Sequence, residues 1–413
     1  MLKKIKKIDY FIVLILVMLM IISIMSIFSV TAGTKWDGYH IRKIGYYVVG
    51  FVAFFGMLFL DYKILIKNAL YIYLLGIALL VIVHFVGSDI NNAQGWLQIP
   101  GLPSLQPAEL FKLVLVIFLS FVLIRKKKNK LAFWSDVVPI GLLTFLPFAL
   151  VMLQNDLGNA LSYIVILLAM LWIGNIKFSH AFIGLSVIAA STFGGIQAYI
   201  HFHEQIAKFF TSIKRQHWLE RIDPWLMNSP SWHIDNAKLA IASGGLFGEG
   251  FRQGTSVQSG RVPYTYSDSI FVQIAEEFGF VGASVLLLLY FILIHRLILI
   301  ALETRDRTGS YLIVGVVAML IYQIAENIGA FIGIMPLTGI TLPFISYGGT
   351  SLLINMASVG LAMSVKVHGH EHEEDLLLKR KADLDKKNAG KNGKTGNLER
   401  TKKNRIQIRM PQR

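Results

Sequence analysis

The chain has no cysteine, so disulfide bridges and thiol catalysis are excluded. It also lacks a phosphate-binding glycine-rich loop with lysine, a zincin motif and a nucleophile elbow. Charged residues are scarce, at 16% of 413 residues, whereas hydrophobic residues make up 54%. Soluble domains carry about 45–50% apolar residues and rarely contain unbroken apolar runs of ~20 residues. Together these features indicate a membrane protein.

Long apolar runs recur along the sequence. The first, Tyr10–Val30, is long enough to cross about 30 Å of hydrocarbon as a helix. The preceding "MLKKIKK" could open a signal peptide, but the run is too long for one, so we interpret it as a retained helix. We expect an all-α, polytopic integral membrane protein with about ten transmembrane helices. They lie near Tyr10–Val30, Gly45–Leu60, Ala69–Val86, Leu110–Ile124, Val137–Leu153, Asn159–Ile173, Ala181–Ile200, Ile270–Ile300, Ser310–Ile334 and Leu342–Val365.

Lysine and arginine in the short loops predict the orientation of these helices. "MLKKIKK", "DYKILIK", "RKKKNK", "GNIKF", "HRLILIALETRDR" and the basic C-terminal segment all fall on one side, which is then cytoplasmic. Both termini are therefore expected in the cytoplasm. The longest loop on the extracellular side, about residues 201–269, separates the seventh and eighth helices. Its stretch "QIAKFFTSIKRQHWLERI" is either a helix in the headgroup plane or a simple soluble helix.

The C-terminal segment differs in composition from the rest of the chain. From Lys379 onward it holds 13 Lys and Arg against three Asp and Glu, and few apolar residues. This composition predicts a basic, disordered cytoplasmic tail over residues 367–413, after a transmembrane domain at residues 1–366. The tail could bind anionic lipid, or it could simply be solvated and fix the topology.

Ionisable and amide residues gather at the outer ends of the predicted helices. Charged groups at membrane depth are costly, and they usually face a bundle interior or a watery cavity. Glu109 and Lys112 could be functional, or they could form an i,i+3 ion pair that holds a helix end. Asp268 could be catalytic, or it could only cap the eighth helix. The other polar residues of this kind are Arg42, Asp156, Gln273, Glu276, Glu277, Gln323, Asn327 and Glu326, the last of which could belong to a buried interhelical pair.

Several motifs occur in a familiar order and spacing from about Arg42 to Ser351. They are "SLQPAELFKL", "QNDLGNA", "RIDPWL" followed by "AIASGGLFGEG", and "ENIGAFIGIMPLTGITLPFISYGGTS". Together they resemble the SEDS family, the FtsW, RodA and SpoVE proteins of bacterial cell-wall synthesis. The last motif is highly specific, and the resemblance covers most of the chain. It implies a SEDS fold of ten helices in the cytoplasmic membrane of a bacterium.

The resemblance also implies an activity. The family comprises peptidoglycan glycosyltransferases that polymerise lipid II into glycan strands at the outer face of the membrane, in elongation, division or sporulation. The expected partners are lipid II, polyprenyl-pyrophosphate-linked glycan, a class B penicillin-binding protein (a transpeptidase) and the membrane, but no nucleic acid. Two alternatives remain: a lipid II flippase or transporter, and a non-catalytic scaffold for the transpeptidase.

The stretch "VPYTYSDSIF" matches the family segment whose Asp is taken as catalytic, which implies that Asp268 is the catalytic residue. The family's Glu, Thr and Phe in this segment are replaced by Tyr264, Ser267 and Ser269, and Tyr264 motivates the scaffold alternative. The matched motifs imply a set of substrate-binding residues: Arg42, Trp96, Gln106, Glu109, Lys112, Asp156, Ser243, Gly244, Gly245, Glu277, Ser346, Gly348 and Gly349.

The reaction implied by the resemblance is a single inverting displacement between lipid-linked sugars. Asp268 would take the proton from the acceptor hydroxyl as general base. Lys112 and Arg42, with Mg²⁺ or Mn²⁺ as the expected cofactor, would balance the charge of the leaving pyrophosphate. Asp156 and Glu109 would orient these cations. The sequence does not identify ligands for the metal.

Overall fold

The structure, a computed structural model, describes residues 7–90, 93–98, 104–126, 130–212, 216–227 and 229–369. Within these ranges, nine helices are long and apolar enough to cross a membrane. They are α2 (Tyr10–Thr31), α3 (Tyr39–Phe59), α5 (Ala69–Val86), α6 (Pro107–Arg125), η1 and α7 together (Phe133–Leu153), α9 (Phe178–His201), α14 (Ile270–Glu303), α15 (Arg307–Ile332) and a last helix, Gly349–Gly369. The shorter apolar helix α8 (Leu157–Ile173) packs against α7, α6 and α15. The prediction of about ten membrane helices is confirmed.

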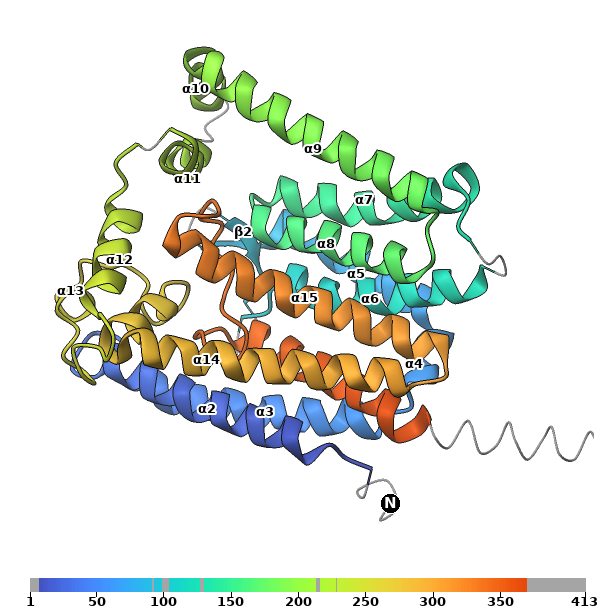
Figure 1. The fold of residues 1–413 in the computed structure, drawn as a ribbon, viewed down its shortest axis with the longest axis horizontal. Helices are drawn as coiled ribbons and strands as arrows, with labels where there is room; N and C mark the ends of the chain where they lie inside the picture. Colours follow the sequence, from blue (N-terminus) through green and yellow to red (C-terminus); the bar gives the residue numbers. More distant parts are fainter. Residues whose placement is uncertain are drawn as a thin grey trace, which may run out of the picture.

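Shorter elements connect these helices. Between α9 and α14 lie α10 (His203–Ser212), α11 (His217–Leu226), α12 (Trp232–Ser243) and α13 (Thr255–Gln258), all at one end of the bundle (Figure 1). Helix α4 (Tyr62–Lys67) joins α3 to α5. An antiparallel hairpin of β1 (Ser88–Ile90) and β2 (Ala93–Trp96) follows α5. The all-α prediction therefore holds except for this small hairpin.

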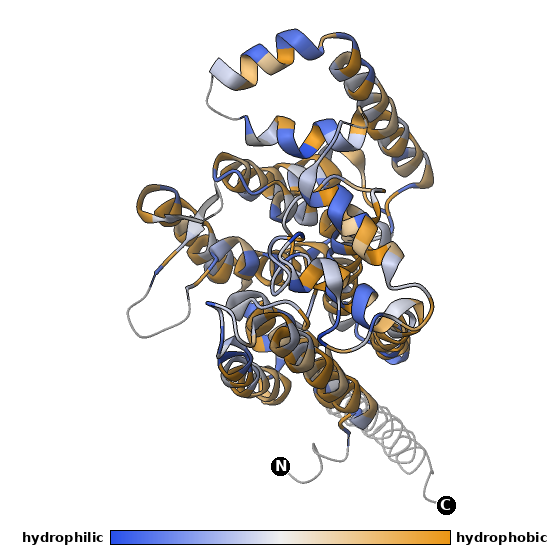
Figure 2. Cartoon of the chain, turned by 90° about the vertical axis from the view of Figure 1, so that its left-hand side faces the viewer, coloured by the Kyte–Doolittle hydropathy of each residue, from blue (hydrophilic) through white to orange (hydrophobic). Residues whose placement is uncertain are grey.

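Burial separates the central helices from those at the margin. In the most apolar window of each helix, 78% of the residues of α6 and 89% of those of the last helix are buried, whereas none is buried in the corresponding window of α9. Helix α9 accordingly lies at the edge of the bundle (Figure 1). Figure 2 views the bundle toward the α10–α13 end and shows apolar residues along the helix sides. The marginal helices thus present apolar side chains to lipid, as a membrane domain requires.

The two ends of the described chain meet at the opposite end of the bundle (Figure 1). The carboxylate of Asp9 caps α2 by accepting a hydrogen bond from Phe11 N (3.2 Å). The same carboxylate forms a 2.8 Å ion pair with Lys366 of the last helix. At the same end, the Tyr62 hydroxyl donates a 2.6 Å hydrogen bond to Asp306, the N-cap of α15. The start of α2 and the end of the last helix therefore lie at the same end of the bundle. A chain that crosses the membrane an even number of times has both termini on one side.

The last helix begins at Gly349, later than the Leu342 that we expected. The segment before it is buried but not helical, and Phe344 has a positive φ of 66°. Four consecutive carbonyls of this segment accept hydrogen bonds from side chains of α2, α3 and α14. The pairs are Tyr290 Oη to Pro343 O (2.5 Å), Tyr47 Oη to Phe344 O (2.5 Å), Ser23 Oγ to Ile345 O (2.6 Å) and Lys43 Nζ to Ser346 O (2.6 Å). Irregular backbone at membrane depth is tolerated only when other protein groups form hydrogen bonds with its free amides and carbonyls. The four side-chain donors do so for the carbonyls of this segment.

Candidate active site

Asp268 lies at the end of a tight turn that leads into α14. The backbone amides of Ser267 and Ser269 both donate to the carbonyl of Tyr264, at 2.9 and 3.2 Å. Tyr264 itself has a φ of 56°, a left-handed conformation that is uncommon for a residue with a bulky side chain. The N-cap of α14 is Ser269, and no side chain caps this helix. The interpretation of Asp268 as a helix cap is therefore wrong, because its carboxylate does not bind the free amides of α14.

The Asp268 carboxylate instead faces polar neighbours. The hydroxyl of Ser267 donates a 2.8 Å hydrogen bond to its Oδ1 atom. Gly339 lies so close that a Cβ atom at this position would be 3.5 Å from Asp268 Oδ2. The backbone of Asp268 is held separately by Asn327 of α15, whose side-chain amide donates to the carbonyl oxygens of Asp268 (2.8 Å) and Ile340 (2.7 Å). One amide group thus ties the start of α14 to the loop after α15.

The environment of Asp268 tunes its acidity. Burial raises the pKa of the carboxyl from 3.8 to about 6, while the hydrogen bond from Ser267 and the nearby charge of Arg221 oppose the shift. A general base works best when its pKa lies close to the working pH. The site therefore gives Asp268 a proton affinity that suits proton abstraction near neutral pH.

A second polar cluster surrounds the predicted motif residues of α6 and α8. Asp156 caps α8 by accepting a hydrogen bond from Asn159 N (3.1 Å), and its other oxygen accepts one from Gln106 Nε2 (2.9 Å). The Gln106 backbone amide donates to Thr350 Oγ1 of the last helix at 3.2 Å. Asp156 and Gln106 are thus joined directly, and they connect α8, α6 and the last helix.

Glu109 and Lys112 form a buried i,i+3 ion pair, which the sequence analysis gave as the alternative to a functional role for these residues. Lys112 Nζ lies 2.7 Å from Glu109 Oε2, and both side chains are almost completely buried. The positive charge of Lys112 is therefore balanced within α6. Its role toward a substrate phosphate remains a prediction.

The loop 338–340 links the two polar regions. A Cβ atom on Gly158, beside Asp156, would collide with Ile340 and Thr338, so only glycine allows this close approach. Thr338 also donates a hydrogen bond to Glu326 of α15. Residues 338–340 thus contact the Asp156 loop on one side and, through Gly339, lie against Asp268 on the other.

Arg42 lies on the exposed surface of α3, with its guanidinium carbon 5.6 Å from the centre of the Tyr39 ring. Tyr39 stacks on Tyr347 at 4.4 Å and meets Tyr266 edge-on at 5.6 Å. The backbone amide of Tyr347 donates to the carbonyl of Tyr266, two residues before Asp268, at 2.9 Å. Arg42 is therefore an accessible cation that reaches the Asp268 segment through a cluster of tyrosines.

The glycine-rich turn after α12 is packed on a break in α14. Gly279 interrupts this helix with a φ of 65°. The turn supplies the partners that the break removes, through Phe280 N to Gly245 O (2.9 Å), Val281 N to Leu246 O (3.1 Å), Glu249 N to Glu276 O (2.9 Å) and Gly250 N to Glu277 O (3.0 Å). A Cβ atom on Gly244 would overlap the Ala275 carbonyl. Close backbone packing explains Gly244, and a left-handed φ of 50° explains Gly245. A role for Ser243, Gly244 and Gly245 in substrate binding stays a prediction.

Glu276 and Glu277 are both buried in α14 and fully engaged. Glu276 accepts hydrogen bonds from Ser256 N (2.7 Å) and Val257 N (2.9 Å) at the start of α13. Glu277 accepts from Ser29 Oγ (2.5 Å), Gln258 Nε2 (3.2 Å) and Gln273 Nε2 (2.7 Å). Both acids thus join α14 to its neighbours, and contact of Glu277 with substrate remains a prediction.

The remaining predicted residues lie on connecting segments. Trp96 ends β2, and its carbonyl accepts a 3.1 Å hydrogen bond from Ser88 Oγ. Ser346 is buried, with its hydroxyl accepting from Leu342 N at 2.8 Å, and Gly348 and Gly349 lead into the last helix.

Sequence reasoning missed Lys43, whose side chain is completely buried, and Arg221, whose charge acts on Asp268. Lys43 could have been noticed in the sequence, because it is a lysine within the apolar stretch of α3.

Comparison with known proteins decides the family. The model of the FtsW/RodA/SpoVE cell cycle proteins matches residues 6–371. The chain belongs to this family. Among similar FtsW/RodA/SpoVE proteins, stage V sporulation protein E of Bacillus subtilis is 32% identical over 78% of this chain and 86% of its own length. The peptidoglycan glycosyltransferase MrdB of Escherichia coli is 32% identical over 79% of this chain and 85% of its own.

Solved structures of the FtsW/RodA/SpoVE fold match as well. A chain from a structure described as the coordination of polymerization and crosslinking by a peptidoglycan synthase complex has a TM-score of 0.73, with 26% identity over 88% of this chain and 98% of its own. The rod shape determining protein RodA of Thermus thermophilus has a TM-score of 0.64, with 27% identity over 88% of this chain and 97% of its own. The membrane fold described above is thus the family fold.

Proposed function

We propose that this protein is a peptidoglycan glycosyltransferase that polymerises lipid II, with Asp268 as general base. The observation that carries the proposal is Asp268 itself, a carboxylate held just before the start of α14 with a pKa raised to about 6. Relatives that cover most of the chain bear the name peptidoglycan glycosyltransferase, which supports the reaction class.

The reaction requires proton removal from the acceptor hydroxyl and stabilisation of the leaving pyrophosphate. Asp268 takes the proton, and the acceptor oxygen displaces the pyrophosphate with inversion at the sugar carbon. Arg42 and Arg221 are the cations best placed for the pyrophosphate. Arg42 is exposed, and Arg221 lies near enough to Asp268 for its positive charge to lower the pKa of that carboxyl. Lys112 is a weaker candidate, since Glu109 already neutralises it.

The expected Mg²⁺ or Mn²⁺ finds no ready-made site among the residues that the structure describes. Among the described residues, no three His, Asp or Glu side chains converge in a way that could hold a metal ion. Magnesium often binds through one or two carboxylates and substrate phosphates. The proton transfer and displacement described above use protein groups alone, and a metal ion would have to bind mainly through the substrate pyrophosphate.

We further propose that the Asp268 end faces the outside and that both termini are cytoplasmic. The proposal is supported by the basic residues Lys63, Lys67, Arg125 and Lys126 at the end of the bundle shared by the termini. A class B penicillin-binding protein is the proposed partner, because one similar structure belongs to a synthase complex that both polymerises and crosslinks.

Purified protein supplied with labelled lipid II tests the function. Formation of glycan strands is expected, and Asp268→Asn should reduce the rate by ~10²–10⁴-fold, the usual effect of losing a general base. Asp235→Asn, at an exposed aspartate of α12, is the matched control and should retain the wild-type rate. Lipid movement between leaflets without polymer would favour a flippase, and neither activity would favour a scaffold.

A further inference from the structure

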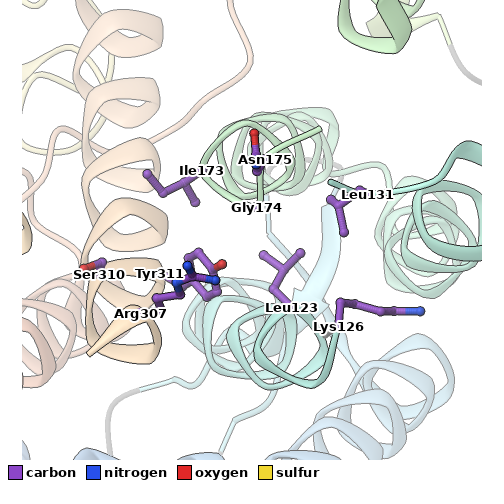
Figure 3. A pocket seen from close by; sticks show the side chains of 9 residues that line it. All are labelled: Leu123, Lys126, Leu131, Ile173, Gly174, Asn175, Arg307, Ser310 and Tyr311. Carbon is purple, nitrogen blue, oxygen red and sulfur yellow. The ribbon is translucent and has the colours of Figure 1, made fainter. Parts of the chain in front are cut away.

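A cavity at the end of the bundle shared by the termini is unrelated to Asp268. It has a volume of about 590 Å³ and lies between the end of α6, the end of α8 and the first turn of α15 (Figure 3). Its walls are Leu123, Lys126, Leu131, Ile173, Gly174, Asn175, Arg307, Ser310 and Tyr311. The proposed site of glycosyl transfer at Asp268 lies at the other end of α15, where Asn327 contacts it, so this cavity needs its own explanation.

The cavity is amphiphilic. Leu123, Leu131 and Ile173 form an apolar wall, and Figure 3 shows them on the α6 and α8 side of the opening. Arg307 and Tyr311 come from α15 and are four residues apart, so they lie on one face of that helix. A ligand that fits such a cavity carries an apolar part and a polar, negatively charged part.

Of the two cations among the described residues that line the cavity, Lys126 is ion-paired and Arg307 is not. Lys126 extends away from the centre (Figure 3) and pairs with Asp136 at 2.8 Å. Asp306 is the N-cap of α15 and accepts hydrogen bonds from Thr308 N (3.2 Å) and Tyr62 Oη (2.6 Å). Arg307 is exposed and forms no salt bridge with another described residue. Its guanidinium is therefore the group available to an anion.

The depth of the cavity matches the membrane interface. Trp172, next to Ile173 in α8, is 64% exposed, and Trp134 in η1 is 80% exposed. Exposed tryptophans at helix ends mark the headgroup level of a bilayer. Basic pockets between helices on the cytoplasmic side are suited to anionic lipid headgroups.

We propose that this cavity binds an anionic glycerophospholipid, with the phosphate on Arg307 and Tyr311 and an acyl chain along Leu123 and Ile173. Arginine is well suited to phosphate because its guanidinium donates two parallel hydrogen bonds. The apolar wall explains why a lipid is favoured over a small phosphate ion, which would leave that wall unfilled. This inference is independent of the proposed enzymatic function.

Native mass spectrometry of the full-length protein, titrated with phosphatidylglycerol or with phosphatidylcholine of the same acyl chains, tests the site. We expect preferential retention of phosphatidylglycerol. Arg307→Gln should weaken it about tenfold or more, as expected for a lost charge-assisted hydrogen bond. Arg296→Gln is the matched control, because it removes the same charge from α14 outside the cavity, and it should bind as the wild type does.

A second variant keeps the test decisive if Arg307→Gln does not fold. Tyr311→Phe keeps the ring and removes only the hydroxyl, so retention of phosphatidylglycerol should fall by about two- to tenfold. Displacement of the lipid by glycerol 3-phosphate or inorganic phosphate at equal concentration would instead indicate a site for free phosphate. Equal retention by wild type, Arg307→Gln and Arg296→Gln, or equal retention by wild type and Tyr311→Phe, would overturn the proposal.

Discussion

Asn327 holds the backbone of Asp268: its side-chain amide lies 2.8 Å from the Asp268 carbonyl oxygen and 2.7 Å from that of Ile340. Both hydrogens of the amide are therefore used to fix the position of the proposed base. The support comes from α15, outside the turn that carries Asp268, so the base is held by two elements rather than one.

The first prediction follows from this contact. Asn327→Leu keeps the size of the side chain but leaves two carbonyls without a donor. The polymerisation rate should fall by about 10–100-fold through misplacement of the base, and the free energy of unfolding should fall by about 1–3 kcal/mol. Asn236→Leu, at a half-buried asparagine of α12 whose side-chain amide donates within its own helix to Trp232 O (2.8 Å), should change neither quantity much. A normal rate in Asn327→Leu would show that this contact does not position Asp268.

The raised pKa of Asp268 predicts the pH dependence of activity. The base accepts a proton only when it is ionised, so the rate should rise with pH through about 6 and level off above it. Initial rates of polymerisation across this range measure the effect. A rate that is flat from about pH 5 to about pH 8 would contradict the assignment.

The same pKa predicts an effect on stability with the opposite trend. The folded pKa lies above the unfolded value of 3.8, so the protonated acid favours the folded state, and this stabilisation is lost as pH rises through about 6. Asp268→Asn resembles the protonated acid at every pH. Its Tm should match that of the wild type below about pH 4 and exceed it increasingly from about pH 4 to about pH 6, and the excess should level off at higher pH. A constant Tm difference would mean that Asp268 does not titrate in this window.

The acids of α14 predict a structural defect rather than a catalytic one. Glu276→Gln loses one of the two oxygens that accept hydrogen bonds from the start of α13, so folded yield should drop and the free energy of unfolding should fall by about 1–3 kcal/mol. Glu303→Gln, at the exposed end of the same helix, is the control. Size-exclusion chromatography and thermal unfolding in detergent measure both. Wild-type yield and stability for Glu276→Gln would contradict the role described.

The orientation of the helices can be tested directly because the chain has no native cysteine. Lys35 and Lys67 are both exposed and lie at opposite ends of the bundle. A membrane-impermeant maleimide should label Lys35→Cys in intact cells and Lys67→Cys only after the membrane is permeabilised. The reverse pattern would place Asp268 on the cytoplasmic side and exclude the proposed reaction there.

The sequence predicted the helices well because long aliphatic runs have few alternatives in a membrane. It also drew attention to Asp268 through a family motif, and the catalytic role of this residue stays a prediction. It did not predict the break at Gly279, because the groups that satisfy the break come from the turn around Gly245. It also missed Lys43 and the irregular segment at Pro343–Ser346. At the break the backbone is satisfied by backbone groups of a distant turn, and at residues 343–346 it is satisfied by distant side chains. Such pairs leave no local periodicity in the sequence. The cap interpretation of Asp268 failed for a related reason, since a cap is defined by the geometry of the turn.

The four carbonyls at residues 343–346 have a consequence for how the protein is made. Their donors, Ser23, Lys43, Tyr47 and Tyr290, all precede them in the chain. Synthesis proceeds from the N-terminus, so every donor has left the ribosome before its acceptor does. The last segment therefore completes the bundle rather than nucleating it. A product truncated before Leu342 would lack the acceptors of the Lys43 ammonium and of the Tyr47 and Tyr290 hydroxyls, so these polar groups would need other partners at membrane depth.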